Sequence, residues 1–261
     1  MTHQNTRSAW IVRPATLLVI LGFGFLGAGA TAAGAAETPS AEELLSRSIA
    51  HHDPEGLFLS GTWCLSFVES RPGGSDRQSE IVVDVPNERF RMVRRAEHEI
   101  AGRLDTERCE MTLDGRADVS EAEREKHKIS CERLTLMRNY YVYLWGLPMK
   151  LRDPGTRLGE VEETTFMDRQ VYGLRVTYDA EVGGDTWYFY FDRGSAALVG
   201  YRFYHDESKN DGEYIVLTGE HRAHGMRLPE SRAWYTHQDD RHLGTDRLRK
   251  LASCPGDSTF S

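Results

Sequence analysis

The most constraining feature of this 261-residue sequence is an aromatic stretch, Thr186–Leu217, which polar residues interrupt twice. Eight aromatic residues lie between Trp187 and Tyr204, and aromatic and β-branched residues favour strands. The interruptions at 193–195 and 207–212 have the composition of hairpin loops. The stretch therefore predicts three consecutive antiparallel strands.

The first of these strands is aromatic on both faces. Because side chains alternate along a strand, Trp187, Phe189 and Phe191 share one face. Tyr188 and Tyr190 share the other. Such a strand needs cover on both sides, so we expect a sheet that curls around an apolar interior.

Turn signals recur at short intervals along the chain, as in an antiparallel meander. Candidate strands before the middle of the chain are 57–69, 80–85, 89–97, 100–104 and 108–113, and those after it are 157–165, 170–178, 186–191, 197–205, 213–221, 226–235 and 243–251. About a dozen strands with few helices predict a mainly β (α+β) fold. We expect a highly curved, incompletely closed antiparallel β-barrel.

Helical patterns precede and interrupt these strands. Ser40 and Glu43 form a capping box before an N-terminal helix, and Ser120 and Glu123 form a second one. After the second box, 131–145 places apolar and tyrosine side chains at helical spacing. We expect this helical insert, about 119–146, and the apolar loop to residue 151 to plug the open face of the sheet.

The first 36 residues have the pattern of a cleavable secretory signal. Arg7 and Arg13 precede the apolar run Ala15–Leu26, which is too short to span a bilayer comfortably. Small residues end at Ala36, where we expect cleavage. The predicted organisation is a signal peptide, 1–36, and a single curved-sheet domain, 37–261. A retained membrane anchor is the alternative.

The excess of acidic over basic residues limits which partners the protein can bind. The chain has 32 basic and 40 acidic residues, and removal of 1–36 takes away two arginines and no acids. Nucleic acids and anionic membrane surfaces require basic patches, so we expect neither as a partner. We expect a periplasmic or secreted monomer with no stable membrane insertion after cleavage.

Four cysteines in an exported chain predict two disulfides, for which three pairings are possible. Cys109 and Cys131 flank one insert-like segment and are paired first, which leaves Cys64 with Cys254. A metal site is the alternative, but no C-x-x-C spacing occurs and no cysteine has a histidine at zinc-finger spacing. We therefore predict no metal and no cofactor.

Four runs of residues are long and specific. They are N-Y-Y-V-Y-L-W-G-L-P-M-K-L-R-D-P-G-T at Asn139–Thr156, D-T-W-Y-F-Y-F-D at Asp185–Asp192, A-L-V-G-Y-R-F-Y-H-D at Ala197–Asp206 and D-G-E-Y-I-V-L at Asp211–Leu217. They resemble the signature of a family of exported bacterial proteins that is known chiefly as a domain of unknown function. Its architecture is distantly similar to the lipoprotein-localisation carrier (LolA/LolB-like) superfamily. This resemblance implies periplasmic binding of acyl chains or another greasy ligand, and it assigns no catalytic residues.

The leading functional hypothesis is a carrier or binding protein for an apolar ligand such as a lipid or a lipoprotein acyl chain. Aromatic and methionine side chains bury large areas and adapt to varied shapes. The predicted lid is Tyr141, Trp145, Leu147 and Met149, and the predicted wall is Trp187, Phe189, Phe191, Tyr201 and Phe203. The alternative is that the same residues only fill the core.

Two other classes of function remain open. A secreted hydrolase or metal-dependent enzyme would use the His205/Asp206 region together with downstream histidines at 221, 224, 237 and 242. Against it, the sequence has neither a G-x-S-x-G elbow nor an H-E-x-x-H motif. An envelope protein-interaction or sensor module would use sheet edges or the charged helix at 121–128.

Overall fold

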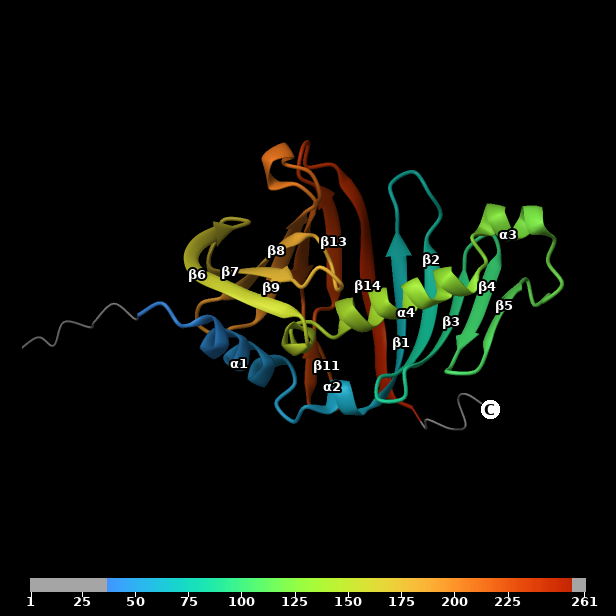
Figure 1. Cartoon of the computed structure of the whole chain (residues 1–261), viewed down its shortest axis with the longest axis horizontal. Helices are drawn as coiled ribbons and strands as arrows, with labels where there is room; N and C mark the ends of the chain where they lie inside the picture. The colour runs from blue at the N-terminus through green and yellow to red at the C-terminus, as the bar shows by residue number, and fades with distance from the viewer. Residues whose placement is uncertain (1–36, 255–261) are drawn as a thin grey trace, which may run out of the picture. The chain divides into compact units, whose positions relative to one another are not determined.

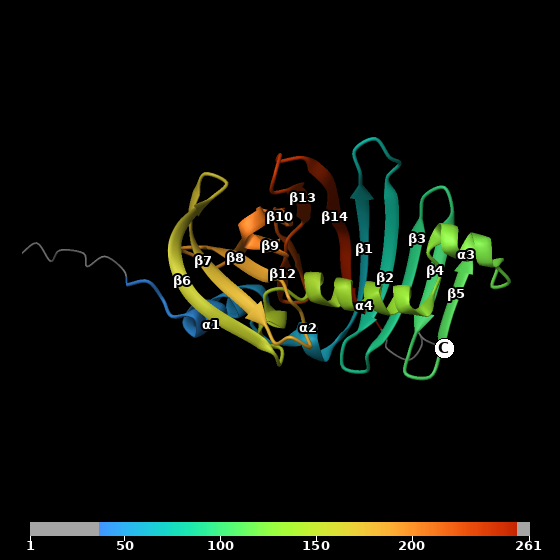
Figure 2. The ribbon, with the colours of Figure 1, turned by 45° about the horizontal axis from the view of Figure 1, so that its top comes forward.

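One large antiparallel sheet dominates the structure, a computed structural model that describes residues 37–254. Its twelve strands follow the order β5-β4-β3-β2-β1-β14-β13-β10-β9-β8-β7-β6, and two short strands form a separate hairpin. The sheet is strongly curved but not closed, because β5 and β6 are free edges (Figure 2). The predicted mainly β, incompletely closed antiparallel barrel is therefore confirmed.

The described elements have the following bounds. The strands of the large sheet are β1 Thr62–Ser70, β2 Arg77–Asp84, β3 Arg89–Arg95, β4 Glu99–Leu104, β5 Cys109–Leu113, β6 Thr156–Phe166, β7 Arg169–Tyr178, β8 Thr186–Asp192, β9 Leu198–Tyr204, β10 Glu213–Thr218, β13 Ser231–Thr236 and β14 His242–Ser253. The separate hairpin is β11 His221–Ala223 with β12 Met226–Leu228. The helices are α1 Ala41–His52, α2 Leu57–Ser60, α3 Glu121–His127 and α4 Cys131–Trp145, with 3-10 turns η1 Met149–Arg152 and η2 Glu207–Lys209.

The aromatic stretch forms three neighbouring antiparallel strands, β8, β9 and β10, as predicted. Phe189 and Phe191 pack into the interior cluster with Leu144 of α4. Tyr190 belongs to a different cluster on the other face of the sheet, where it stacks on Phe166 with ring centroids 4.3 Å apart. The C-terminal half of β8 is thus buried on both faces, at Phe189 and Phe191 on one and at Tyr190 on the other.

Helix α4 supplies the cover on the concave face. It runs across β14, β1, β2 and β3 in both views of the ribbon (Figures 1 and 2). Tyr141 and Trp145 pack on Phe67 of β1, with ring centroids 5.2 and 5.4 Å apart. Leu144 and Leu147 enter the cluster beneath β7–β10. The helical plug therefore divides the interior into a β1–β4 side and a β7–β10 side.

Local signals place the helix starts. Ser120 and Glu123 form the predicted capping box at α3, and the Ser40 hydroxyl accepts the backbone N–H of Glu43 at α1. The prediction of one strand over 57–69 is wrong at its start, where α2 is helical. The Asp53 carboxylate accepts the backbone N–H groups of Leu57 and Phe58 at 2.8 and 2.9 Å, which favours a helical turn there.

The predicted strand over 226–235 is also wrong, because it is two strands. Pro229 lies between β12 and β13 and lacks the N–H that a continuous ladder needs. The predicted strand over 213–221 is likewise interrupted, since Gly219 adopts φ +67° between β10 and β11.

Two disulfides hold the sheet and α4. Cys109–Cys131 joins β5 to the first residue of α4, and Cys64–Cys254 joins β1 to the residue after β14. Both pairings agree with the expectation. Disulfides form in oxidising compartments, so they point to an extracytoplasmic protein. The predicted signal peptide at 1–36 lies outside the described residues. Within 37–254, no helix is long and apolar enough to cross a membrane.

Candidate functional site

The nine residues predicted as lid and wall lie in two environments. Seven are buried among other side chains: Tyr141, Trp145, Leu147, Met149, Phe189, Phe191 and Tyr201. Leu147 contacts the cluster of the predicted wall, whereas Trp145 and Met149 pack with the β1–β4 cluster. The structure therefore brings only part of the predicted lid onto the predicted wall.

The two remaining residues, Trp187 and Phe203, are half-buried and line an open groove of about 590 Å³ beside α4. We call it the aromatic groove. Its other lining residues are Arg71, Leu136, Tyr140, Tyr143, Leu144, Asp185, His205, Glu213, Trp234 and Leu243. The groove therefore lies between one face of α4 and the strands β8, β9, β13 and β14.

Ring contacts fix the walls of the aromatic groove. Trp187 stacks on Phe203 with centroids 4.8 Å apart, and Tyr143 meets Trp187 edge-on at 5.8 Å. Tyr140 stacks on Trp234 at 6.2 Å. Burial raises the pKa of Tyr140 and Tyr143 well above the usual value for a phenol. Both rings therefore stay uncharged, which suits an apolar ligand.

Charged groups border the same groove. Arg71 pairs with Asp246 at 3.4 Å and with Glu69 at 3.7 Å. The indole N–H of Trp234 donates to Asp246 at 3.2 Å. Burial raises the pKa of Asp246, and the Arg71 charge opposes that shift. The aromatic groove thus combines apolar walls with a fixed polar network at Arg71.

A buried arginine ties α4 to the sheet. Arg232 of β13 donates from Nη2 to the carbonyl of Leu144 at 2.8 Å, and its guanidinium carbon lies 3.8 Å from the centroid of the Trp145 ring. Within the described part of the chain, Arg232 Nε and Nη1 and the Tyr201 hydroxyl have no hydrogen-bond partner. The C-terminal end of α4 therefore rests on a polar group inside an apolar core.

The residues of the enzyme alternative have structural partners. His205 pairs with Asp185 at 2.8 Å. The Asp206 carboxylate accepts the backbone N–H of Ser208 at 3.0 Å and shapes the η2 turn. His237 stacks on Tyr204 with centroids 4.4 Å apart. Among residues 37–254, no group of three or more His, Cys, Asp or Glu is arranged to hold a metal ion.

Sequence reasoning missed most of the groove. Leu136, Tyr140 and Tyr143 follow one another at i, i+4 and i+7 on α4, a spacing that indicates one helix face. That signal was available in the sequence. Trp234 and Arg71 carried no such signal, since they reach the groove only through the pairing of β13, β14 and β1.

Comparison with known families identifies the group to which the chain belongs. Residues 23–249 match the profile of DUF6503, described as a family of unknown function. The chain is a member of the DUF6503 family. This agrees with the resemblance in the sequence to an exported family of unknown function. A search of curated protein sequences found no significant match.

One solved structure shares the architecture of this DUF6503 protein, and others are more weakly similar. A LolA superfamily protein from Nitrosomonas europaea superimposes with a TM-score of 0.53 at 10% identity, covering 85% of this chain and 98% of that chain. A putative outer membrane lipoprotein-sorting protein domain from Vibrio parahaemolyticus gives 0.48 at 10% identity, covering 83% and 94%. A DUF1329 family protein from Desulfovibrio piger gives 0.48 at 9% identity, covering 85% and 97%. The first of these confirms the LolA-like fold, and fold alone does not assign function.

Proposed function

We propose that this DUF6503 protein is an extracytoplasmic carrier or binding protein for an apolar ligand, such as a lipid or a lipoprotein acyl chain, which it holds in the aromatic groove. The observation that supports this most directly is the groove itself. Its volume of about 590 Å³ falls within the range of small-molecule sites. Leu136 leaves 53% of its surface exposed there, beside half-buried Trp187 and Phe203.

Burial of an alkyl chain in the groove contributes favourably to the free energy of binding. Removing ~300 Å² of apolar surface from water at ~25 cal/mol per Å² contributes roughly 7 kcal/mol before ordering costs. The buried part of the predicted wall is already packed against Leu144 and Leu147. A ligand therefore lies along the side of α4 and leaves the core beneath the helix intact.

The proposed function also includes a location outside the cytoplasm. Residues 1–36 act as a signal peptide that is removed near Ala36, and 37–261 forms one domain that works as a monomer in the periplasm or outside the cell. A carrier released from the membrane in this way reaches a lipid at a membrane surface and keeps its chain out of water. Its LolA-like architecture is compatible with this use.

The test is a groove variant with a matched control. Leu136→Glu places a carboxylate in the groove. Met167→Glu places one at a residue that lies outside the groove and is 50% exposed. We expect Leu136→Glu to weaken binding of dodecanol, measured by isothermal titration calorimetry, about tenfold, equivalent to ~1.4 kcal/mol. Met167→Glu should bind as the unmodified protein does. Equal affinities of the two variants would contradict the proposal.

Native mass spectrometry gives an independent check. Protein purified from the periplasm of its own host should carry a co-purifying lipid, and Leu136→Glu should carry less of it than Met167→Glu. A protein without any bound lipid that also fails to bind dodecanol would exclude the carrier function.

A further inference from the structure

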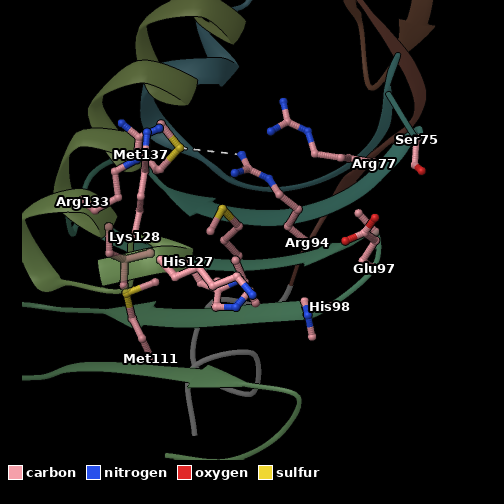
Figure 3. A pocket seen from close by; sticks show the side chains of 15 residues that line it. Ser75, Arg77, Arg94, Glu97, His98, Met111, His127, Lys128, Arg133 and Met137 are labelled. Carbon is pink, nitrogen blue, oxygen red and sulfur yellow. Dashed lines mark hydrogen bonds between the residues drawn. The ribbon is translucent and has the colours of Figure 1, made fainter. Parts of the chain in front are cut away.

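A second pocket, separate from the aromatic groove, lies over β3, β4 and β5 beside the junction of α3 and α4 (Figure 3). Its volume is about 480 Å³. We call it the cationic pocket. Its floor is apolar and consists of Met92, Ile100, Met111, Leu134 and Met137. Its cations are Arg77, Arg94, Lys126, Lys128 and Arg133. A volume of this size is typical of small-molecule sites.

The cations in this pocket outnumber the carboxylates. The only carboxylate among its described lining residues is Glu97, which lies beside Arg94 and on the opposite side of the close-up from Lys128 and Arg133 (Figure 3). Glu69, which pairs with Arg77 and Arg94, adds a second negative charge. Five cations therefore face two carboxylates, although the whole chain carries a net charge of −8.

Three of the cations lack a charged partner. Within 37–254, Lys126, Lys128 and Arg133 have no carboxylate within the 4.0 Å limit for an ion pair. They come from the end of α3, the residue after it and the first turn of α4. Because like charges repel, gathering them around one hollow favours an anion between them.

The two arginines are also short of acceptors. Arg77 and Arg94 both pair with Glu69, at 3.3 and 3.5 Å, and Arg71 from the other side shares the same carboxylate. Arg77 Nε is buried and has no hydrogen-bond partner among the described residues, and Arg94 Nε, also without a hydrogen bond there, is the atom that lies 3.5 Å from the Glu69 carboxylate. Charge-assisted hydrogen bonds from arginine to phosphate or carboxylate are strong, and both arginines line the pocket while sharing one carboxylate with Arg71.

The charges adjoin the apolar floor directly. Arg94 Nη2 lies 3.7 Å from the sulfur of Met137 and 2.7 Å from the hydroxyl of Tyr141. Three of the five floor residues are methionines, whose flexible side chains adapt to varied chain shapes. A hydrophilic anion would use only the rim, whereas a ligand with both a charge and an alkyl chain uses rim and floor.

We propose that the cationic pocket binds the anionic head group, phosphate or carboxylate, of a single-chain amphiphile, with the first part of the chain on the methionine floor. The proposal concerns a different pocket from the aromatic groove and stands whether or not that groove takes a ligand. The charge of the head group then determines which lipids this pocket binds, and uncharged amphiphiles such as dodecanol bind outside it.

Calorimetric titration of the intact mature chain with four ligands tests this. The ligands are dodecyl phosphate, dodecanoate, dodecanol and inorganic phosphate. We expect the two anionic amphiphiles to bind at least tenfold more tightly than dodecanol, and at least tenfold more tightly than inorganic phosphate. Their affinity should fall as salt concentration rises, because exposed charges are screened.

The variant is Lys128→Asn combined with Arg133→Gln. Asn tolerates the left-handed backbone of Lys128, whose φ is +56°, and Gln preserves helix propensity in α4. The control is Arg247→Gln with Arg249→Gln, which removes the same charge from exposed positions of β14. We expect the first pair of substitutions to weaken the binding of both anionic amphiphiles about tenfold without changing the affinity for dodecanol. The control pair should change the affinity for none of these ligands.

Several results would overturn the proposal. One is equal affinity for dodecanol and dodecanoate, and another is unchanged binding of dodecyl phosphate by Lys128→Asn/Arg133→Gln. Inorganic phosphate binding as tightly as dodecyl phosphate would mean a free-anion site instead. Leu136→Glu distinguishes failure of this proposal from failure of the carrier function. It should weaken dodecanol binding and leave the preference for anionic amphiphiles over dodecanol intact. If Leu136→Glu alone abolished that preference, the anion would sit in the aromatic groove.

Discussion

The two faces of α4 differ in chemistry although they belong to one helix. Toward the aromatic groove it presents Leu136, Tyr140, which stacks on Trp234, and Tyr143, which meets Trp187 edge-on. Toward the cationic pocket it presents Arg133 and Met137, which are long and flexible. Rigid rings define a shape, whereas flexible side chains accept several. A single helix can therefore separate a shape-selective site from a charge-selective one.

The two sites share one carboxylate. Glu69 pairs with Arg71, which lines the aromatic groove, and with Arg77 and Arg94, which line the cationic pocket. Glu69 also accepts hydrogen bonds from Ser79 at 2.6 Å and Tyr141 at 3.4 Å. A charge entering either site acts on the same buried network, so the contrast between the faces depends on α4 staying in place.

The largest expected effect comes from the residue that holds α4 down. Arg232→Ala removes the hydrogen bond to the Leu144 carbonyl and the contact with the Trp145 ring. Loss of this buried hydrogen bond together with the packing of a large buried side chain costs about 4 kcal/mol of unfolding free energy, measured by urea denaturation. Arg249→Ala, exposed on β14, should change it by less than ~0.5 kcal/mol. A loss below ~1 kcal/mol for Arg232→Ala would show that α4 is held mainly by apolar packing.

Loss of the Cys109–Cys131 disulfide should have a smaller effect, which concerns only the face of α4 toward the cationic pocket. Replacing Cys109 and Cys131 by serine releases the first residue of α4 from β5, near the cationic pocket. Closure of a loop of 22 residues contributes about 3 kcal/mol through the unfolded chain. We expect this loss in denaturation, together with weaker dodecyl phosphate binding and unchanged dodecanol binding. Equal weakening of both ligands would mean that the two faces of α4 are not independent.

The smallest effect is a pH dependence of stability that arises at the end of α1. His52, buried at the end of α1, contacts the carbonyl of Arg227 through Nδ1 at 2.6 Å and accepts the N–H of Leu198 on Nε2 at 2.9 Å. Burial lowers its pKa from 6.5 to about 4. The unfolded chain therefore takes up a proton first as pH falls below 6.5, and folded stability is lost between pH 6.5 and 4.

From these values, the contribution of His52 falls by about 2 kcal/mol between pH 8 and pH 5. Denaturation of the unmodified protein and of His52→Gln at both pH values measures it, since all other groups titrate in both proteins. The stability difference between them should shrink by that amount at pH 5. An equal fall in both proteins would assign the pH dependence to other groups.

The sequence predicted the elements of this fold well because their signals are local. Alternating aromatics and regular turn signals located β8, β9 and β10, and the Ser120/Glu123 pair located the start of α3. The short apolar run 57–60 gave no such signal, because a few apolar residues fit a strand or a helical turn equally well. There, the Asp53 side chain accepts the backbone N–H groups of Leu57 and Phe58, four and five residues later, and favours the helical turn.

The site was harder to predict because it depends on long-range placement. The sequence predicted that α4 faces the aromatic sheet, but which tyrosines stay accessible depends on how the helix lies over that sheet. The cations of the second pocket come from β2, β3, α3 and α4. The strand pattern of 89–97 does not distinguish arginines that face solvent from arginines that face the interior. Only the register of β3 shows that Arg94 turns inward to Glu69 while Arg95 pairs with Glu80 and Glu99 at the surface.

The pairing of β14 with β1 has a consequence for how the chain folds. Among residues 37–254, the last strand, β14, lies between the first strand, β1, and β13, and Cys64–Cys254 spans 190 residues where β1 meets β14. The strands on either side of β14 cannot join into one sheet until the C-terminal residues have emerged. Pairings this distant in sequence form slowly. A chain leaving the ribosome therefore keeps its sheet incomplete for most of its synthesis, a state that is compatible with threading through a membrane before folding.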